Sequence, residues 1–136
     1  MIRQIEISLP PFRRGYHIIT GIIKKEIGEL PENGLLNIFI KHTSAAITLN
    51  ENADPTVTED FECFMNALVP DGSSLFRHTD EGADDMPAHI KSSFFGQSLT
   101  IPISNYKLNL GIWQGVYLCE FRNYAGSRKL VLTIYS

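Results

Sequence analysis

The run Leu35–Lys41 places the strongest constraint on the fold, because nearly every position in it is apolar. A strand with apolar side chains on both faces is typical of the middle of a sheet that is covered on both sides. We therefore predict a central strand here. A second strand, Ile47–Asn50, is predicted shortly after it.

Several other segments alternate between apolar and polar residues, as half-buried strands do. The segment 2–9 is one, and 99–103 is another. Two further alternating runs, 116–122 and 128–135, are joined by Asn123–Gly126. Because that connection has the composition of a turn, the two runs are predicted to form an antiparallel hairpin.

Two helices are predicted in the first half of the chain. Thr20 is the expected cap of the first helix. The second begins at Asp54 and Pro55, a capping aspartate followed by a proline in the first turn. Its apolar residues recur at helical spacing, so they are expected to face the core. They are Val57, Phe61, Phe64, Met65 and Leu68.

The composition limits the classes of protein that the chain can belong to. Its 136 residues are expected to form one domain, 1–136, with a sizeable core. The net charge of −3 gives no support for nucleic-acid binding, and no apolar run is long enough to span a membrane. Cys63 and Cys119 lack a CxxC spacing, so we expect reduced, buried thiols in a cytoplasmic protein.

The segment His78–Ser92 concentrates residues that carry chemistry. It holds two of the four histidines and four of the fifteen acidic residues. Asp84 or Asp85 can cap a helix that ends at Gly96, which places His89 in the first turn. The helix dipole there disfavours imidazolium, so it favours the neutral ring that binds a metal or accepts a proton. The alternative is an acidic surface loop before an ordinary helix, with two unrelated histidines.

Two other segments have the composition of a pocket wall. His42 ends the predicted central strand and is followed by the hydroxyls of Thr43 and Ser44, which can hold an oxyanion. The alternative is a turn in which these hydroxyls bond local backbone groups. Trp113 and Gln114 stand between two glycines and can form an aromatic wall, although a lone tryptophan also suits a core.

One carboxylate needs a partner. Glu120 shares a strand face with apolar residues, so we expect it to pair with Arg122 or Arg128, or with a ligand.

Taken together, these motifs resemble the YjbQ-like family, often described as secondary thiamine-phosphate synthases, over nearly the whole chain. The resemblance implies a single α+β domain with a large, mostly antiparallel sheet or sandwich, about three helices and a homotrimeric assembly. It also implies a pocket near a subunit boundary, with Asp84 and Asp85 beside it. Asp85 stands where Asn is expected in many relatives, so it could cap the helix, bind a cation or do both. The motifs are His42–Ala45, Asn50–Pro55, His78, Glu81–Gly82, Asp84–Ser92 and Leu110–Gly115.

The resemblance also suggests a cofactor and a reaction. The matching histidines, His42, His78 and His89, would bind Zn²⁺ or a related divalent ion, or would instead hydrogen-bond a phosphate. The implied reaction condenses hydroxymethylpyrimidine diphosphate with a thiazole phosphate, and Mg²⁺ could bind through Asp84 or Asp85. The expected catalytic residues are His42, His89 and Asp84. The expected substrate-binding residues are Thr43, Ser44, Lys91, Trp113, Gln114 and Arg128.

Two other functions stay open. One is a metal-dependent hydrolase or lyase acting on a small phosphorylated metabolite, with Asp84 or Glu81 as the base. The other is a trimer that binds a metabolite or metal without catalysis. His17, on an early basic loop, is not expected to be a ligand.

Overall fold

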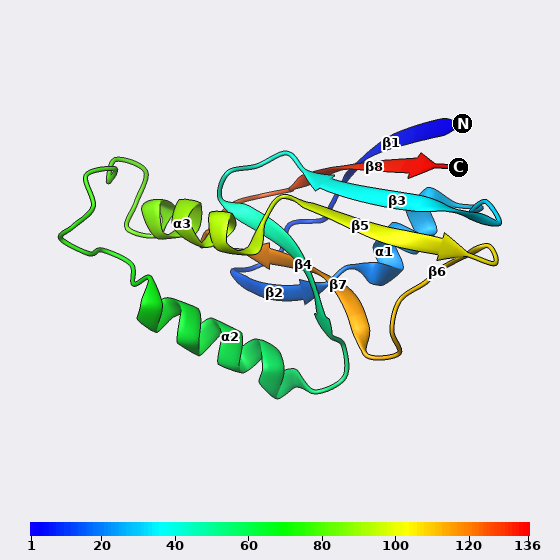
Figure 1. Cartoon of the computed structure of the whole chain (residues 1–136). Coiled ribbons are helices and arrows are strands. Elements are labelled where there is room, and N and C mark those ends of the chain that lie inside the picture. Colours follow the sequence, from blue (N-terminus) through cyan, green and yellow to red (C-terminus); the bar gives the residue numbers. More distant parts are fainter.

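Two antiparallel sheets form the body of the protein (Figure 1). The computed structural model describes all 136 residues. The larger sheet has five strands in the order β1-β8-β3-β5-β6, so the first and last strands of the chain lie side by side. These strands are β1 (Ile2–Ser8), β3 (Asn33–Ile40), β5 (Ser98–Ser104), β6 (Lys107–Leu108) and β8 (Lys129–Tyr135).

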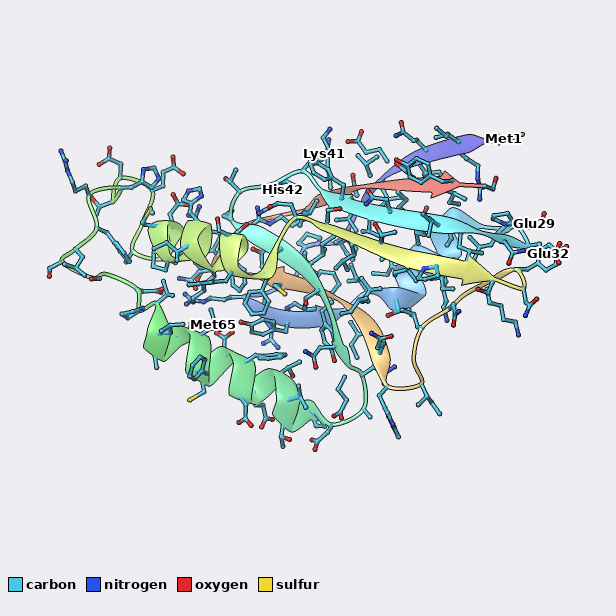
Figure 2. All side chains as sticks on the ribbon, in the orientation of Figure 1. Met1, Glu29, Glu32, Lys41, His42 and Met65 are labelled. Atoms are coloured by element: carbon cyan, nitrogen blue, oxygen red, sulfur yellow. The ribbon has the colours of Figure 1, made fainter.

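The smaller sheet has three strands in the order β2-β7-β4. They are β2 (Gly15–Ile18), β4 (Ala45–Glu51) and β7 (Gln114–Glu120). The chain passes from the larger sheet to the smaller one after β1, β3 and β6, and it returns after β2, β4 and β7. Lys41 and His42 lie in the connection between β3 and β4 (Figure 2).

A core of 17 buried apolar residues joins the two sheets with helix α1 (Thr20–Ile27). Alternate side chains of β3, namely Leu36, Ile38 and Ile40, point into this core. Ile23 and Ile27 of α1 lie one helical turn apart and are also buried. Side chains fill the space between the elements in Figure 2.

Helices α2 (Pro55–Leu68) and α3 (Asp85–Phe95) lie beside the smaller sheet (Figure 1). The Asp54 carboxylate accepts a hydrogen bond from the Thr56 N–H, which confirms the predicted cap of α2. Helix α3 lies against β4, where the Ser92 hydroxyl donates to the Ala45 carbonyl. An aromatic cluster formed by Tyr16, Phe61, Phe95 and Phe121 joins α2, α3 and the smaller sheet.

The structure confirms the predicted α+β class with three helices and antiparallel sheets. It corrects the predicted hairpin of 116–122 with 128–135. β7 pairs with β2 and β4, whereas β8 pairs with β1 and β3. The residues between them form a crossing from one sheet to the other, which local turn composition does not distinguish from a hairpin loop.

Three predictions about burial also change. β3 is central, but one of its faces is open, since Leu35 and Phe39 are 45% and 44% exposed. Phe64 and Leu68 of the α2 stripe are exposed, and only Met65 in this helix is buried. Cys119 is buried as expected, whereas Cys63 is exposed.

None of the helices has both the length and the apolar composition that a membrane crossing requires.

Candidate functional site

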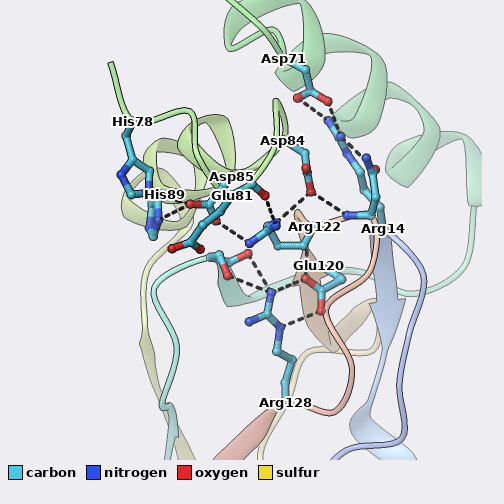
Figure 3. Close-up of polar contacts among 12 residues, drawn as sticks. Arg14, Asp71, His78, Glu81, Asp84, Asp85, His89, Glu120, Arg122 and Arg128 are labelled. Atoms are coloured by element: carbon cyan, nitrogen blue, oxygen red, sulfur yellow. Dashed lines mark hydrogen bonds and ion pairs between the residues drawn. The ribbon is translucent and has the colours of Figure 1, made fainter. Parts of the chain in front are cut away.

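The start of α3 brings two histidines to one carboxylate (Figure 3). Asp85 is the first residue of α3, and His89 follows one helical turn later on the same face. His78, on the loop before the helix, folds back to the same point. Oδ2 of Asp85 lies 2.8 Å from Nε2 of His78 and 3.1 Å from Nε2 of His89. One nitrogen or oxygen atom from each of these three residues lies within 4.8 Å of those of the other two.

The backbone of Thr43 determines how the His89 ring is used. Nδ1 of His89 lies 3.0 Å from the Thr43 carbonyl oxygen. A carbonyl only accepts, so Nδ1 carries a proton and donates it. In a neutral ring Nε2 is then an acceptor, and it faces the Oδ2 acceptor of Asp85. Two acceptors at this distance need a cation between them, which can be a proton or a metal ion.

The donor set fits a divalent metal ion. Two imidazoles and one carboxylate with open positions suit Zn²⁺, Fe²⁺ and related ions. Ligand atoms around a tetrahedral Zn²⁺ lie roughly 3.3 Å apart at ordinary bond lengths. The two separations from Oδ2 of Asp85, 2.8 Å to His78 and 3.1 Å to His89, are a few tenths of an ångström shorter than this. His78 and His89 are 49% and 29% exposed, so the position is open to solvent.

Arg122 anchors the acidic loop from the end of β7. Its Nη1 lies 2.6 Å from Oδ1 of Asp85, the oxygen that the histidines do not use. Its Nη2 donates to the Glu81 carbonyl oxygen at 2.9 Å. Its Nε donates to Oδ2 of Asp84, also at 2.9 Å. One guanidinium thus holds Glu81 and Asp84 of the loop before α3, together with Asp85, the first residue of the helix.

Asp84 is an anchor as well. Its Oδ2 also accepts from the Asn123 N–H at 2.9 Å, and its side chain does not cap α3. Burial works to raise the pKa of Asp84, but the hydrogen bonds from Asn123 and Arg122 outweigh it and lower that pKa. A carboxylate with a lowered pKa is a weak proton acceptor at neutral pH. The structure therefore gives no support to Asp84 as a general base.

Similar forces act on Asp85, which is almost wholly buried. Burial works to raise its pKa, but the hydrogen bond from His78 and the charge of Arg122 outweigh it and lower that pKa. Asp85 is thus held as an anion. An anionic oxygen between two imidazoles attracts a cation.

His42 lies outside this group. Its Nε2 accepts a hydrogen bond of 2.8 Å from the Lys129 N–H, so that lone pair is already engaged. Burial and then the charge of Arg128 lower the pKa of His42, so the ring stays neutral at pH 7. The structure brings His78 and His89 together with Asp85 rather than with His42.

Glu120 and Arg128 form a buried ion pair, as expected for a carboxylate on an apolar strand face. Two guanidinium nitrogens of Arg128 lie 2.7 and 2.6 Å from the two carboxylate oxygens. Nη2 of Arg128 also donates to the carbonyl and the hydroxyl of Ser44. These contacts hold the turn that carries His42 and Thr43, and they engage Arg128 and Ser44 away from solvent.

Other expected substrate-binding residues lie apart from the histidines. Lys91 is 1% exposed, and its Nζ donates to Oδ1 of Asn66 at 2.6 Å. Trp113 and Gln114 lie at the start of β7, whereas Arg122 follows its end. A strand of seven residues separates these two ends by roughly 20 Å. Within one chain, Trp113 therefore does not reach the histidines.

Arg122 is a residue of the site that the sequence does not predict, and the sequence leaves the role of Asp85 open between helix cap and cation ligand. Asp85 and His89 are four residues apart on a predicted helix, and this spacing is the sequence feature that indicates that their side chains meet. Nothing in the local sequence links Arg122 to that helix. The contact forms because the end of β7 lies beside the loop before α3, which is a property of the whole fold.

Fold and site together define a small, mostly antiparallel α+β protein with two histidines and an aspartate gathered at a helix start. The chain belongs to the family described as UPF0047 protein YjbQ-like, whose model matches residues 4–136.

Similar proteins and structures match nearly the full length of the chain. The UPF0047 protein YjbQ of Salmonella typhimurium is 48% identical over 134 residues, covering 97% of this chain and 95% of that protein. The Escherichia coli O157:H7 protein of the same description is 44% identical over 133 residues, covering 96% of each chain. An uncharacterised conserved protein of Clostridium acetobutylicum matches with a TM-score of 0.84 and 38% identity, covering 96% of this chain and 99% of that one. A hypothetical protein of Aeropyrum pernix has a TM-score of 0.85 at 27% identity and covers 98% of each chain.

Proposed function

We propose that the protein is an enzyme that acts on small phosphorylated metabolites and depends on a divalent metal ion. His78, Asp85 and His89 would hold the ion. The proposal rests on two acceptor atoms that face each other, Nε2 of His89 and Oδ2 of Asp85. The Thr43 carbonyl fixes the His89 tautomer, so Nε2 and Oδ2 of Asp85 face each other at 3.1 Å and require a cation. A divalent ion in this position would take the place of the proton that a charged His89 would share with Asp85, and metal titration distinguishes the two.

The surroundings of the cluster support an anionic substrate. Arg122 uses three of its five N–H groups on Asp84, Asp85 and the Glu81 carbonyl. Two N–H groups remain, and 21% of the side chain is exposed. A phosphate or carboxylate near the histidines can accept from them. A divalent ion bound there would supply Lewis acidity toward an oxygen of that group.

The thiamine-phosphate condensation stays a prediction of the family resemblance. It requires a diphosphate and a second substrate to bind together. Hydrolysis or elimination requires only one phosphorylated substrate beside the proposed metal ion, and we place it first. Binding without catalysis is the third possibility, and turnover measurements separate it from the other two.

Metal content tests the proposal most directly. Purified, untagged protein is analysed for bound metal and titrated with Zn²⁺, beside Asp85→Asn, His89→Ala and His42→Ala variants. We expect about one ion per chain, retained in His42→Ala and lost in the other two. His17→Ala is the matched control for removal of a histidine elsewhere. Zn²⁺ binding that is unchanged in both Asp85→Asn and His89→Ala would overturn the assignment.

The reaction is tested on the metal-loaded protein. Release of pyrophosphate from hydroxymethylpyrimidine diphosphate, dependent on thiazole phosphate, would identify the condensation. Release of inorganic phosphate from a panel of phosphomonoesters would identify hydrolysis. Turnover of either kind must disappear in Asp85→Asn. An undiminished rate in that variant would place the chemistry elsewhere.

We also propose that the protein assembles as a homotrimer. The outer face of the larger sheet exposes Leu35, Phe39 and Tyr135 by 44–45% each. Exposed apolar patches of this kind mark contact surfaces. A second copy could also bring Trp113 to the open histidine site, which its own chain cannot do. Light scattering at micromolar concentration tests this, and a mass of one chain would overturn it.

A further inference from the structure

A hollow of about 780 Å³ lies between the carboxyl end of α1 and the turn that joins β5 to β6. Glu29 marks this region in Figure 2, at the opposite end of the molecule from α3. Apolar side chains, among them Ile27 and Leu108, line part of the hollow, together with Lys24, Tyr106 and Lys107. Its volume falls in the range of small-molecule binding sites.

Tyr106 stands in this hollow in a backbone conformation that a tyrosine rarely adopts. Asn105 and Tyr106 form the two-residue turn between β5 and β6, with φ values of 50° and 65°. A turn with two positive φ values favours Asn followed by Gly. A side chain in the left-handed region costs about 1 kcal/mol relative to glycine. The ring is 64% exposed, so burial offsets little of this cost.

Charge in the hollow is unbalanced. Lys24 and Lys107 form no ion pair, and Glu29 is the one carboxylate in the lining. Two ammonium groups and one carboxylate leave a charge of +1. Strained backbone in a folded protein often accompanies a functional role. An exposed aromatic ring beside unpaired ammonium groups offers a stacking surface and an anion partner together.

We propose that this hollow binds a small planar aromatic molecule that carries one phosphate or carboxylate group. The ligand ring stacks on Tyr106, and the anionic group pairs with Lys107 or Lys24. The site is separate from the histidines and does not depend on the metal proposed there. Failure of either proposal therefore leaves the other standing.

Tyr106→Gly is a sharp test because it removes the ring and suits the turn. Phenyl phosphate is titrated into the full-length protein, and NMR follows the backbone amides of Gly28, Lys107 and Leu108. We expect saturable shifts that become about tenfold weaker or more in Tyr106→Gly, the size expected for loss of one stacking partner. The Tm of this variant is expected to stay unchanged or rise. Loss of binding in a variant of full stability shows a ligand role rather than a structural one.

Matched probes and variants complete the test. Tyr124→Ala removes another exposed tyrosine, 98% exposed, and is expected to bind phenyl phosphate as the wild type does. Phenol and inorganic phosphate, each alone, are expected to bind more weakly than phenyl phosphate. Three results would overturn the proposal: no saturable shift with phenyl phosphate, equal binding by Tyr106→Gly, or equal shifts with inorganic phosphate alone.

Discussion

Arg122 and Asp85 are joined through one carboxylate oxygen, while the other oxygen faces both imidazoles. Nη1 of Arg122 lies 2.6 Å from Oδ1, and Oδ2 lies 2.8 Å from His78 and 3.1 Å from His89. The guanidinium therefore fixes the rotation of the carboxylate. Partners of this kind orient metal ligands and adjust their affinity.

Arg122→Gln is predicted to weaken Zn²⁺ binding by about 10- to 100-fold, the usual cost of losing a partner of a metal ligand. The cause is a carboxylate that is free to rotate away from the histidines. Isothermal titration with Zn²⁺ measures the dissociation constant. The d–d absorption of bound Co²⁺ is expected to change as well, because it reports the geometry of the ligands.

The control for this prediction is Arg14→Gln. Arg14 also bonds several partners, among them Asp71, Asn66 and Asn123, but it contacts none of the three proposed metal ligands. We expect it to lower stability while leaving the Zn²⁺ dissociation constant unchanged. Equal losses of affinity in the two variants would show that Arg122 acts only through general stability.

The pKa of Asp84 predicts a loss of stability in acid. Hydrogen bonds from Asn123 and Arg122 hold its folded pKa below the unfolded value of about 3.9. Its contribution is therefore complete above that unfolded pKa and is lost as the pH falls through the folded pKa. Urea unfolding at a series of pH values from 6 to 2 is expected to show a smaller acid loss in Asp84→Asn than in the wild type. Asp80, in the same loop, is exposed, so Asp80→Asn should follow the wild type.

The sequence predicts most of the local structure because local signals determine it. Asp54 and Pro55 begin α2, and Gly96 ends α3, as capping preferences require. His89 lies one helical turn beyond Asp85 instead of in the first turn. This shift explains why the two side chains meet.

What the sequence does not predict depends on contacts between distant segments. Thr20 was expected to cap α1, but Ile19 takes that position and the Thr20 hydroxyl accepts from the Val116 N–H. Arg122 reaches Asp85 across 37 positions of the chain. The periodic pattern shows which face of a helix or strand is apolar, but the packing of the elements decides which of those residues are buried.

The unfolding free energy is predicted to fall more when one partner of the Glu120–Arg128 ion pair is replaced than when both are replaced. Glu120 is fully buried, so Glu120→Gln or Arg128→Met leaves one uncompensated buried charge. Each single change is expected to cost about 3–5 kcal/mol of unfolding free energy. The double change Glu120→Gln with Arg128→Met removes both charges and is expected to cost less than either single change. Urea unfolding of the four proteins in a double-mutant cycle measures this, and additive losses would contradict the pairing.

Helix α2 offers two apolar residues with opposite environments in adjacent positions. Met65 is 8% exposed, whereas Phe64 is 66% exposed. Met65→Ala is therefore predicted to lower the unfolding free energy by about 2 kcal/mol or more, through lost burial and a residual cavity. Phe64→Ala is predicted to change it by less than about 0.5 kcal/mol, as surface substitutions usually do. Urea unfolding at low protein concentration compares them, because dilution removes any contact that an assembled partner makes with Phe64. A large loss in Phe64→Ala under those conditions would show that α2 turns its apolar stripe toward its own chain.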